Sequence, residues 1–199
     1  MLFIEISINY KYNLFYFIFM IITISGLAGS GKSTVAKLLA KKLGFKHYST
    51  GDFMRQIAQE RGITLLELGY LAEKDKGAID RELDARQKEL GEKENNFVID
   101  ARLGFLFIPK SFKIFLEADS EMRARRIFTD KSRKENNMTF DEALKKIEER
   151  EKSNKQRYKE YYNIDFPDKS VFDLVVDTDK IPVEEVVEKI LAQIKNKNL

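Results

Sequence analysis

The feature that most constrains the fold is the stretch GLAGSGKST at residues 26–34, directly behind the apolar run Ile21–Ser25. A short, β-branched apolar run is typical of a buried central strand. Behind the loop, apolar residues at helical spacing predict a helix over Ser33–Leu43, which Gly44 ends. The loop matches G-x-x-x-x-G-K-[ST] at every defined position and lies between a strand and a helix. The sequence therefore predicts a loop that holds the phosphates of a nucleotide.

Each residue of this loop has a physical reason to be there. The glycines let successive backbone N–H groups turn toward one anion, and the helix start adds a positive partial charge. Lys32 would reach the β- and γ-phosphates, and the Ser33 hydroxyl would ligate Mg²⁺. No guanine-recognition sequence N-K-x-D is present, which favours ATP. The predicted cofactors are ATP and Mg²⁺, and the predicted ATP-binding residues are Gly26, Leu27, Ala28, Gly29, Ser30, Gly31, Lys32, Ser33 and Thr34.

Further strands alternate with helices along the chain. Short apolar runs predict them at Phe45–Ser49, Asn96–Asp100, Phe112–Ala118 and Val171–Thr178. Alternation of this kind predicts an α/β fold with a parallel sheet covered on both faces. We expect one domain over residues 20–199. Its helix-rich stretch 52–94, between the second and third strands, would be a small insert that closes over a substrate.

Composition excludes several functions. The chain has 199 residues, a net charge of +3, a sequence pI near 8.8 and no cysteine, so disulfides, thiolate metal sites and cysteine nucleophiles are ruled out. The apolar run from Leu14 to Ile24 is shorter than the roughly 20 residues that span a bilayer. We expect a cytoplasmic protein. Residues 1–19 are interpreted as an extra segment ahead of a functional start at Met20, with an added edge strand as the alternative.

Two clusters at predicted strand ends are candidates for binding a second substrate. In YSTGDFMR, Thr50 and Gly51 follow a strand, Asp52 is predicted to cap the next helix, and Arg55 would offer its guanidinium to a phosphate. In VIDAR, Asp100 ends a strand where a carboxylate would meet Mg²⁺ or its water, with Arg102 in the same crevice. The alternative for this second cluster is a structural ion pair between Asp100 and Arg102.

Arginines on two predicted helices complete the candidate site. Arg126 lies in SEMRARRIF, and Arg150 and Arg157 continue the inward stripe of a long helix predicted over Phe140–Tyr162, about 10.5 Å apart along its axis. We find no candidate general base among these groups, and His47 is interpreted as structural. Phosphoryl transfer to a phosphate nucleophile needs charge neutralisation and alignment instead of a strong base. This pattern is typical of nucleoside-monophosphate kinases.

From Met20 onward the chain resembles the archaeal-type cytidylate kinases, or (d)CMP kinases. The resemblance rests on MIITISGLAGSGKSTVAKLLAKKLG, YSTGDFMRQIAQERG, IDRELDARQ, VIDARL, ADSEMRARRI, IEEREKSNKQRYKEYYNID and DLVVDT, and covers about nine tenths of the chain. It implies a three-layer P-loop kinase fold with a five-stranded sheet in the order 2-3-1-4-5, a monophosphate-binding insert, and a lid over about 129–162. It also implies transfer of the γ-phosphoryl group of Mg·ATP to CMP or dCMP by a monomer.

The resemblance assigns roles residue by residue. Arg55 and Arg102 would hold the CMP phosphate, with Gly51 allowing close approach, while Thr50, Asp100 and Arg81 would lie near the nucleoside. Arg126, Arg150 and Arg157 would form a clamp on the lid side, next to Lys32. One departure stands out, because Asn154 occupies the place of an acidic residue between the two lid arginines.

Two alternatives stay open at this point. An adenylate kinase would also carry STGDFMR, but that family usually has G-F-P-R after the third strand, where this chain has Asp100-Ala101-Arg102-Leu103. An ATP-dependent module of RNA or ribosome assembly would fit the basic balance, yet the arginines are predicted at crevice positions and no RNA-binding motif is found. We therefore expect small-molecule partners, no stable nucleic acid and no membrane.

Overall fold

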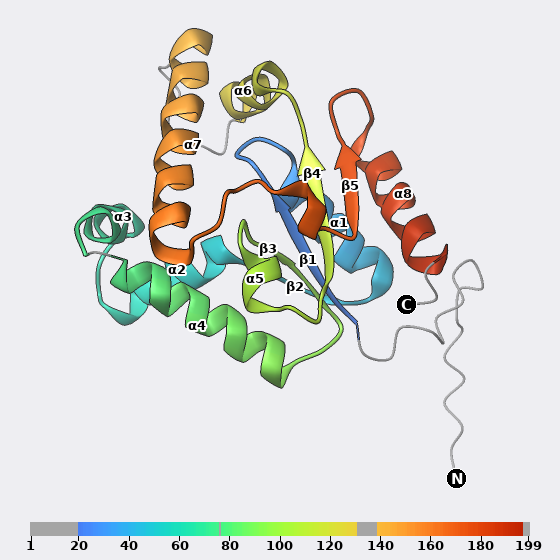
Figure 1. The fold of residues 1–199 in the computed structure, drawn as a ribbon, viewed down its shortest axis with the longest axis horizontal. Coiled ribbons are helices and arrows are strands. Elements are labelled where there is room, and N and C mark those ends of the chain that lie inside the picture. Colours follow the sequence, from blue (N-terminus) through green and yellow to red (C-terminus); the bar gives the residue numbers. More distant parts are fainter. Residues whose placement is uncertain (1–19, 76, 131–138, 197–199) are drawn as a thin grey trace.

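A single parallel sheet forms the centre of the protein (Figure 1). The computed structural model describes residues 20–75, 77–130 and 139–196. Its strand order is β2-β3-β1-β4-β5, as the resemblance implies. The strands are β1 (Ile21–Gly26), β2 (Lys46–Ser49), β3 (Phe97–Asp100), β4 (Phe112–Glu117) and β5 (Leu174–Asp177). Because all pairs are parallel, their carboxyl ends share one edge of the sheet.

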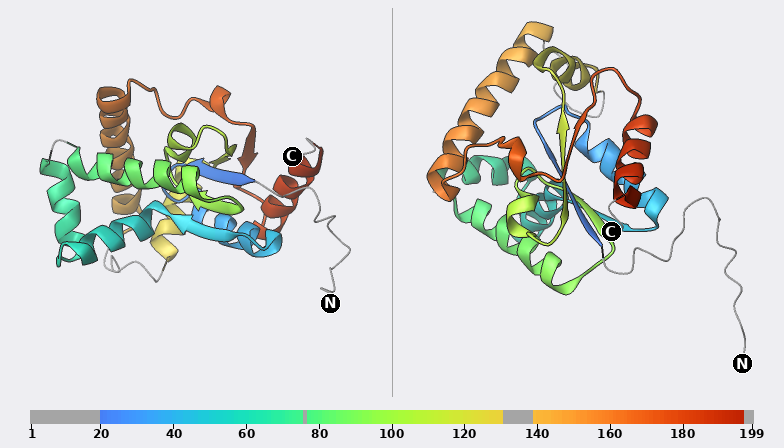
Figure 2. Two further views of the ribbon diagram at one scale, coloured as in Figure 1. Left: turned by 90° about the horizontal axis from the view of Figure 1, so that it is seen from below. Right: turned by 45° about the vertical axis from the view of Figure 1, so that its right-hand side comes forward.

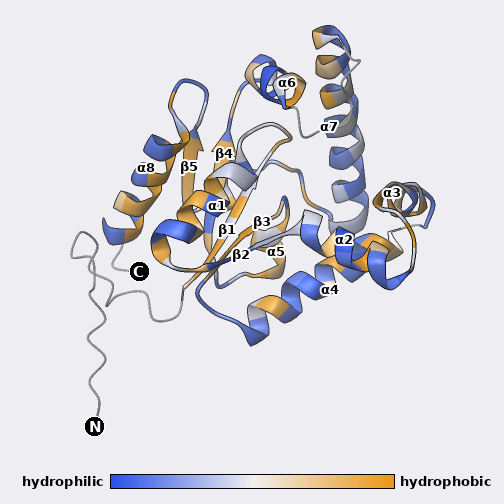
Figure 3. Ribbon diagram, turned by 180° about the vertical axis from the view of Figure 1, so that it is seen from behind, coloured by the Kyte–Doolittle hydropathy of each residue, from blue (hydrophilic) through white to orange (hydrophobic). Residues whose placement is uncertain are grey.

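One face of the sheet packs against α1 (Lys32–Leu43) and α8 (Val183–Asn196), which lie side by side (Figure 2). Ile22 and Ile24 of β1 are fully buried in the same apolar cluster as Leu39 and Ile190. Residues two apart on a strand point to the same face, which explains this pairing. In Figure 3 the central strands are coloured hydrophobic, in keeping with a sheet covered on both sides.

The opposite face packs against a second apolar cluster. Ile21, Phe97 and Ile99 are buried there with Phe53. The short helix α5 (Gly104–Phe107) follows β3 and lies against β1. Thr23 and Ser25 of β1 also face this side, and their hydroxyls contact Ser111 Oγ at 2.9 Å and Ala101 O at 3.1 Å. The buried polar groups of the central strand are thus hydrogen-bonded.

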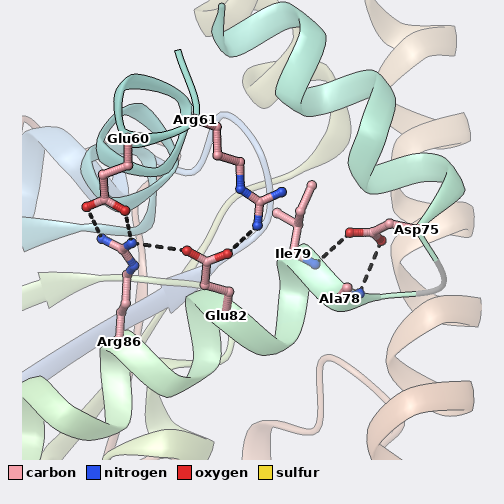
Figure 4. A network of polar contacts seen from close by, with 7 residues as sticks. All are labelled: Glu60, Arg61, Asp75, Ala78, Ile79, Glu82 and Arg86. Carbon is pink, nitrogen blue, oxygen red and sulfur yellow. Dashed lines mark hydrogen bonds and ion pairs between the residues drawn. The ribbon is translucent and has the colours of Figure 1, made fainter. Parts of the chain in front are cut away.

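Three helices lie between β2 and β3, and we call them the insert: α2 (Thr50–Glu60), α3 (Leu65–Lys74) and α4 (Ala78–Lys93). They share a small apolar cluster that includes Ile57, Leu68 and Ile79. Figure 4 shows how ion pairs reinforce it, with Arg86 contacting Glu60 at 3.1 Å and Glu82 at 3.0 Å. These pairs link α2 to α4, so we expect the insert to move as one unit.

Two further helices stand beyond the carboxyl ends of the strands (Figure 1). The helix α6 (Ser120–Thr129) is capped by Asp119, whose carboxylate accepts from Met122 N at 2.6 Å. The helix α7 (Phe140–Tyr162) has the predicted bounds, begins with a capping box of Thr139 and Glu142, and ends at Asn163 with φ 54°. Arg126, Arg150 and Arg157 all lie on these two helices.

Two local predictions are wrong. Asp52 does not cap the helix after β2, because that helix begins at Thr50 and Ser49 is its cap, accepting from Asp52 N at 3.0 Å. The fifth strand begins at Leu174 instead of Val171, since a 3₁₀ turn occupies Lys169–Val171. Phe172 then packs against the rings of Phe105 and Phe115, which takes this segment out of the regular strand.

Some predicted segments lie outside the described residues, namely 1–19 and, within the predicted lid, 131–138. Among the described helices, none is both long and apolar enough to cross a membrane.

Candidate active site at the carboxyl edge of the sheet

The glycine loop joins the central strand β1 to α1 in the conformation that its sequence requires. The φ angles of Gly26, Gly29 and Gly31 are 149°, 83° and 87°, values that residues other than glycine rarely adopt. A Cβ atom added at Gly29 would lie 2.5 Å from the Arg123 carbonyl oxygen. Gly31 caps α1 without a side-chain hydrogen bond. The first turn of α1 therefore presents backbone N–H groups to an anion at a helix start.

Polar side chains of the loop lie beside these N–H groups. Lys32 folds back so that its Nζ donates to Leu27 O at 2.7 Å, across the loop. Ser33 and Thr34 are exposed at the start of α1. The hydroxyl of Ser30 is buried with no hydrogen-bond partner among the described residues. Glycine cradle, ammonium group and hydroxyls are the groups that a triphosphate and its metal ion require, so the residues present fit ATP.

The helix α6 contacts the loop through two arginines. Arg126 donates to Thr178 Oγ1 at 3.0 Å and to Gly29 O at 3.5 Å. Arg123 is 4% exposed and donates to Ala118 O at 3.0 Å and to Ala28 O at 3.5 Å, besides pairing with Glu151 of α7. Both guanidinium groups thus border the loop from the same helix face, three residues apart.

Arg126 is assigned a role from the sequence, but Arg123 and Thr178 are not. Thr178, which follows β5, donates to Ser30 O at 3.2 Å and so supports the loop from the far edge of the sheet. The i, i+3 spacing of the two arginines is the signal that could have identified Arg123.

Asp100 is the last residue of β3, paired with Ile24 of β1, and Arg102 follows the strand. The carboxylate of Asp100 is 6% exposed, and its Oδ2 lies 3.0 Å from His47 Nε2 on β2. Among the described residues, the side chain in contact with the Asp100 carboxylate is therefore that of His47, and not the Arg102 guanidinium of the alternative ion pair. His47 thus contacts a candidate site residue, and its interpretation as structural stays a prediction.

A hollow of about 180 Å³ lies between the glycine loop and α7. Leu27 and Ala28 of the loop line it, with Arg102 on one side and Glu151, Asn154 and Tyr158 of α7 opposite. Three segments that are far apart in the sequence thus face the same space. Its position beside the loop, at the carboxyl ends of the strands, is where ligands bind in open parallel sheets.

The insert carries the remaining candidates. Thr50 and Gly51 form the first turn of α2, and the Arg55 guanidinium lies over them, 3.6 Å from a Cβ added at Gly51. Arg55 is 59% exposed and pairs with Asp52. Burial alone would raise the pKa of Asp52, but hydrogen bonds from Ser49 and Arg55 hold it below its usual value. Arg81 is an exposed residue of α4.

The carboxyl-terminal half of α7 reaches the insert. Arg157 Nη1 lies 3.4 Å from Asp80 Oδ2 of α4, and its Nη2 donates to Asn154 Oδ1 at 3.1 Å. One turn along, the Tyr162 hydroxyl donates to Asp84. Arg150 belongs to α7 as well, but its side chain is outside the described part of the structure. The sequence alone does not identify Asp80, Asp84 or Tyr162, because their contacts join separate helices.

Two shikimate kinases are among the solved structures that share this fold. A shikimate kinase from Aquifex aeolicus superposes with a TM-score of 0.58 at 27% identity, covering 90% of this chain and 99% of that one. A shikimate kinase from Acinetobacter baumannii gives a TM-score of 0.62 at 20% identity, covering 92% and 97%. Together with the glycine loop on β1, these likenesses place the protein in the class of P-loop kinases.

Sequence comparison gives the family. The model described as "Cytidylate kinase-like family" matches residues 21–180, and the chain belongs to this family. A relative named cytidylate kinase from Methanocaldococcus jannaschii is 43% identical over 182 residues, 89% of this chain and 98% of the relative. Another of that name from Pyrococcus furiosus is 46% identical over 162 residues, 81% of each chain. The expected family and the expected sheet order are thus confirmed.

Proposed function

We propose that this protein is a cytidylate kinase, which transfers the γ-phosphoryl group of ATP to CMP or dCMP and releases ADP with CDP or dCDP. The observation that carries the assignment is the 40–46% identity to relatives named cytidylate kinase over at least 80% of the chain. The glycine loop on the central strand supports the donor half of the reaction. Monomeric state, cytoplasmic location, and the lack of nucleic-acid or membrane partners stay predictions.

The loop Gly26–Thr34 would hold ATP. Its N–H groups and the Lys32 ammonium would bind the β- and γ-phosphates, after Lys32 exchanges the Leu27 carbonyl for a phosphate oxygen. A bound Mg²⁺ would supply positive charge that offsets the charge of these phosphates. We propose that the Ser33 hydroxyl ligates it and that Asp100 orients its water, because Mg²⁺ prefers oxygen ligands and keeps several waters.

The acceptor phosphate would be bound by Arg55 and Arg102, with Thr50, Gly51, Asp100 and Arg81 toward the nucleoside. An oxygen of the CMP phosphate attacks the γ-phosphorus in line, and the bond to the β,γ-bridging oxygen breaks. Charge that spreads over the transferring group is neutralised by Lys32 and by the lid-side arginines, proposed as Arg126, Arg150 and Arg157. The nucleophile is already an anion at neutral pH, so no protein base is required.

An acceptor panel tests this function. The full chain is assayed with ATP and CMP, dCMP, UMP or AMP, and kcat/KM is measured for each acceptor. We expect CMP or dCMP to be preferred, and we expect Lys32→Ala to lose transfer to every acceptor. If AMP is the best acceptor, the cytidylate assignment is wrong. ATP hydrolysis without transfer, together with salt-dependent RNA binding, would favour the RNA-assembly module instead.

A further inference from the structure

The interface between α4 and α7 contains a charged cluster whose two carboxylates have no role in the proposed reaction. Asp80 and Asp84 lie one turn apart on α4, and Arg157 faces them from α7. The side chains of Asp80 and Arg157 are only 20% and 31% exposed. When two opposite charges are mostly removed from water, each group needs the other, because loss of either one leaves an uncompensated buried charge.

The Asp80–Arg157 contact is an ion pair without tight hydrogen bonds. Its two atoms are 3.4 Å apart, and both Asp80 Oδ2 and Arg157 Nε are buried with no hydrogen-bond partner among the described residues. A bidentate arginine–carboxylate pair would use shorter, aligned N–H···O bonds. The Asp80 carboxylate therefore attracts the Arg157 guanidinium without fixing its position. The N–H groups of Arg157 stay able to donate hydrogen bonds to a phosphate.

From its own helix, Arg157 receives only a neutral partner among the described residues. Asn154 Oδ1 accepts from Nη2 at 3.1 Å, and the guanidinium lies 5.8 Å from the centre of the Tyr158 ring. An amide oxygen orients an arginine less strongly than a carboxylate does. The negative charge that faces this arginine comes from α4, one helix turn away from the hydrogen bond between Asp84 and Tyr162.

Burial and charge act on Asp80 in opposite directions. Burial raises the pKa of Asp80, Asp75 adds to the rise, and the Arg157 and Arg81 guanidinium groups oppose it. The insert and the lid-side helix therefore interact electrostatically as well as by packing. A movement of α4 over the acceptor would carry the carboxylate, and with it the preferred position of Arg157.

We propose that Asp80 is a positioning residue for phosphoryl transfer, supplying from the insert the carboxylate that α7 lacks at Asn154. Its charge attracts the Arg157 guanidinium toward the insert, so that closure of α4 over the acceptor aims this cation at the transferring group. The proposal rests on the proposed function of the protein. Asp80 acts through Arg157 and need not touch either nucleotide.

A double-mutant cycle tests whether Asp80 acts through Arg157. We expect Asp80→Asn to lower kcat for CMP about 10- to 100-fold, the loss typical of a misplaced group, with KM for ATP changed less than about twofold. In the Arg157→Ala background the same change should alter kcat less than about twofold, because the group that it positions is gone. Equal losses in both backgrounds would overturn the proposal.

Relocating the charge supplies a second, sharper test. Asn154→Asp in the Asp80→Asn protein returns a carboxylate to Arg157 from its own helix, and we expect it to recover most of the lost kcat. Glu89→Gln removes the same charge from an exposed pair with Lys93 on α4 and should leave kcat unchanged. Thermal unfolding of each variant shows whether the protein is folded. A folded Asp80→Asn protein with wild-type or higher kcat would overturn the proposal.

These outcomes separate the two proposals. If the wild-type chain does not phosphorylate CMP or dCMP, the proposed function fails. If the wild-type chain does so while Asp80→Asn has wild-type kcat, or while Asn154→Asp restores nothing, the positioning role alone fails.

Discussion

The half-buried carboxyl group of Asp84 predicts a specific pH dependence of stability. Burial raises its pKa from 3.8 to about 6, with the Asp80 charge adding to the rise, while the hydrogen bond from Tyr162 and the charge of Arg157 oppose it. Asp84→Asn removes the charge and keeps an oxygen that can accept from the Tyr162 hydroxyl. The substitution therefore isolates the cost of the buried charge.

The sign follows from the direction of the shift. A carboxyl group whose pKa is higher in the folded state contributes stability that is fully present below about pH 3.8 and is lost as the pH rises through about 6. At about 1.4 kcal/mol for each pH unit, the loss has an upper limit of about 3 kcal/mol. Because water still reaches part of Asp84 and screens its charge, we expect about 1 kcal/mol.

Equilibrium unfolding in denaturant, at about pH 4.5 and about pH 7, measures this loss. We expect Asp84→Asn to be more stable than wild type by about 1 kcal/mol near neutrality, with a smaller difference at the lower pH. Tyr162→Phe is the matched control, because it removes the donor to the carboxylate and should steepen the loss with pH. A difference between Asp84→Asn and wild type that does not change with pH would refute the reasoning.

Three further substitutions test the loop, with a matched control, and the core. Gly29→Ala should weaken ATP binding at least about tenfold, since its φ is 83° and its Cβ would lie 2.5 Å from the Arg123 carbonyl. Gly62→Ala, with φ 65° and no atom within 4 Å, should cost about 1–2 kcal/mol of stability and leave ATP titrations unchanged. Equal ATP affinity in both variants would contradict the proposed loop. Ile190→Ala, in the fully buried face of α8, should lower the unfolding free energy by about 2–5 kcal/mol in denaturant titrations.

The glycine loop could be predicted from sequence because its determinants are contiguous. Strand, glycines, lysine and helix follow one another within residues 21–43, and local backbone geometry decides their conformation. The predicted sheet order also matches the structure, but that prediction came from the resemblance to a family. Local sequence could not supply it, because the pairing of β1 with β3 and β4 joins distant segments. The wrong choice of Asp52 as the cap of α2 has a local cause. Ser49 and Asp52 lie three residues apart and both residue types favour the cap position.

The contacts around the arginines could not be predicted from the helical spacing alone. On α7, helical spacing from Arg150 and Arg157 would bring Tyr161 to the inward face, yet Tyr161 is 38% exposed and Tyr158 is 6% exposed. The stripe shifts because α7 packs on α6 at its beginning and meets Phe166 and the insert near its end. Which carboxylate faces Arg157 is decided by that tertiary arrangement, so Asp80 was not identified from the sequence.

The uninterrupted course of α7 has a consequence for the catalytic cycle. At 1.5 Å per residue its 23 residues form a rod about 34 Å long. Glu151 ties its middle to Arg123 at the donor loop, and Arg157 ties the later part to the acceptor insert. A rod cannot tilt at one of these attachments without displacing the other. Release of one product should therefore weaken the binding of the other product, so the two release steps depend on each other mechanically.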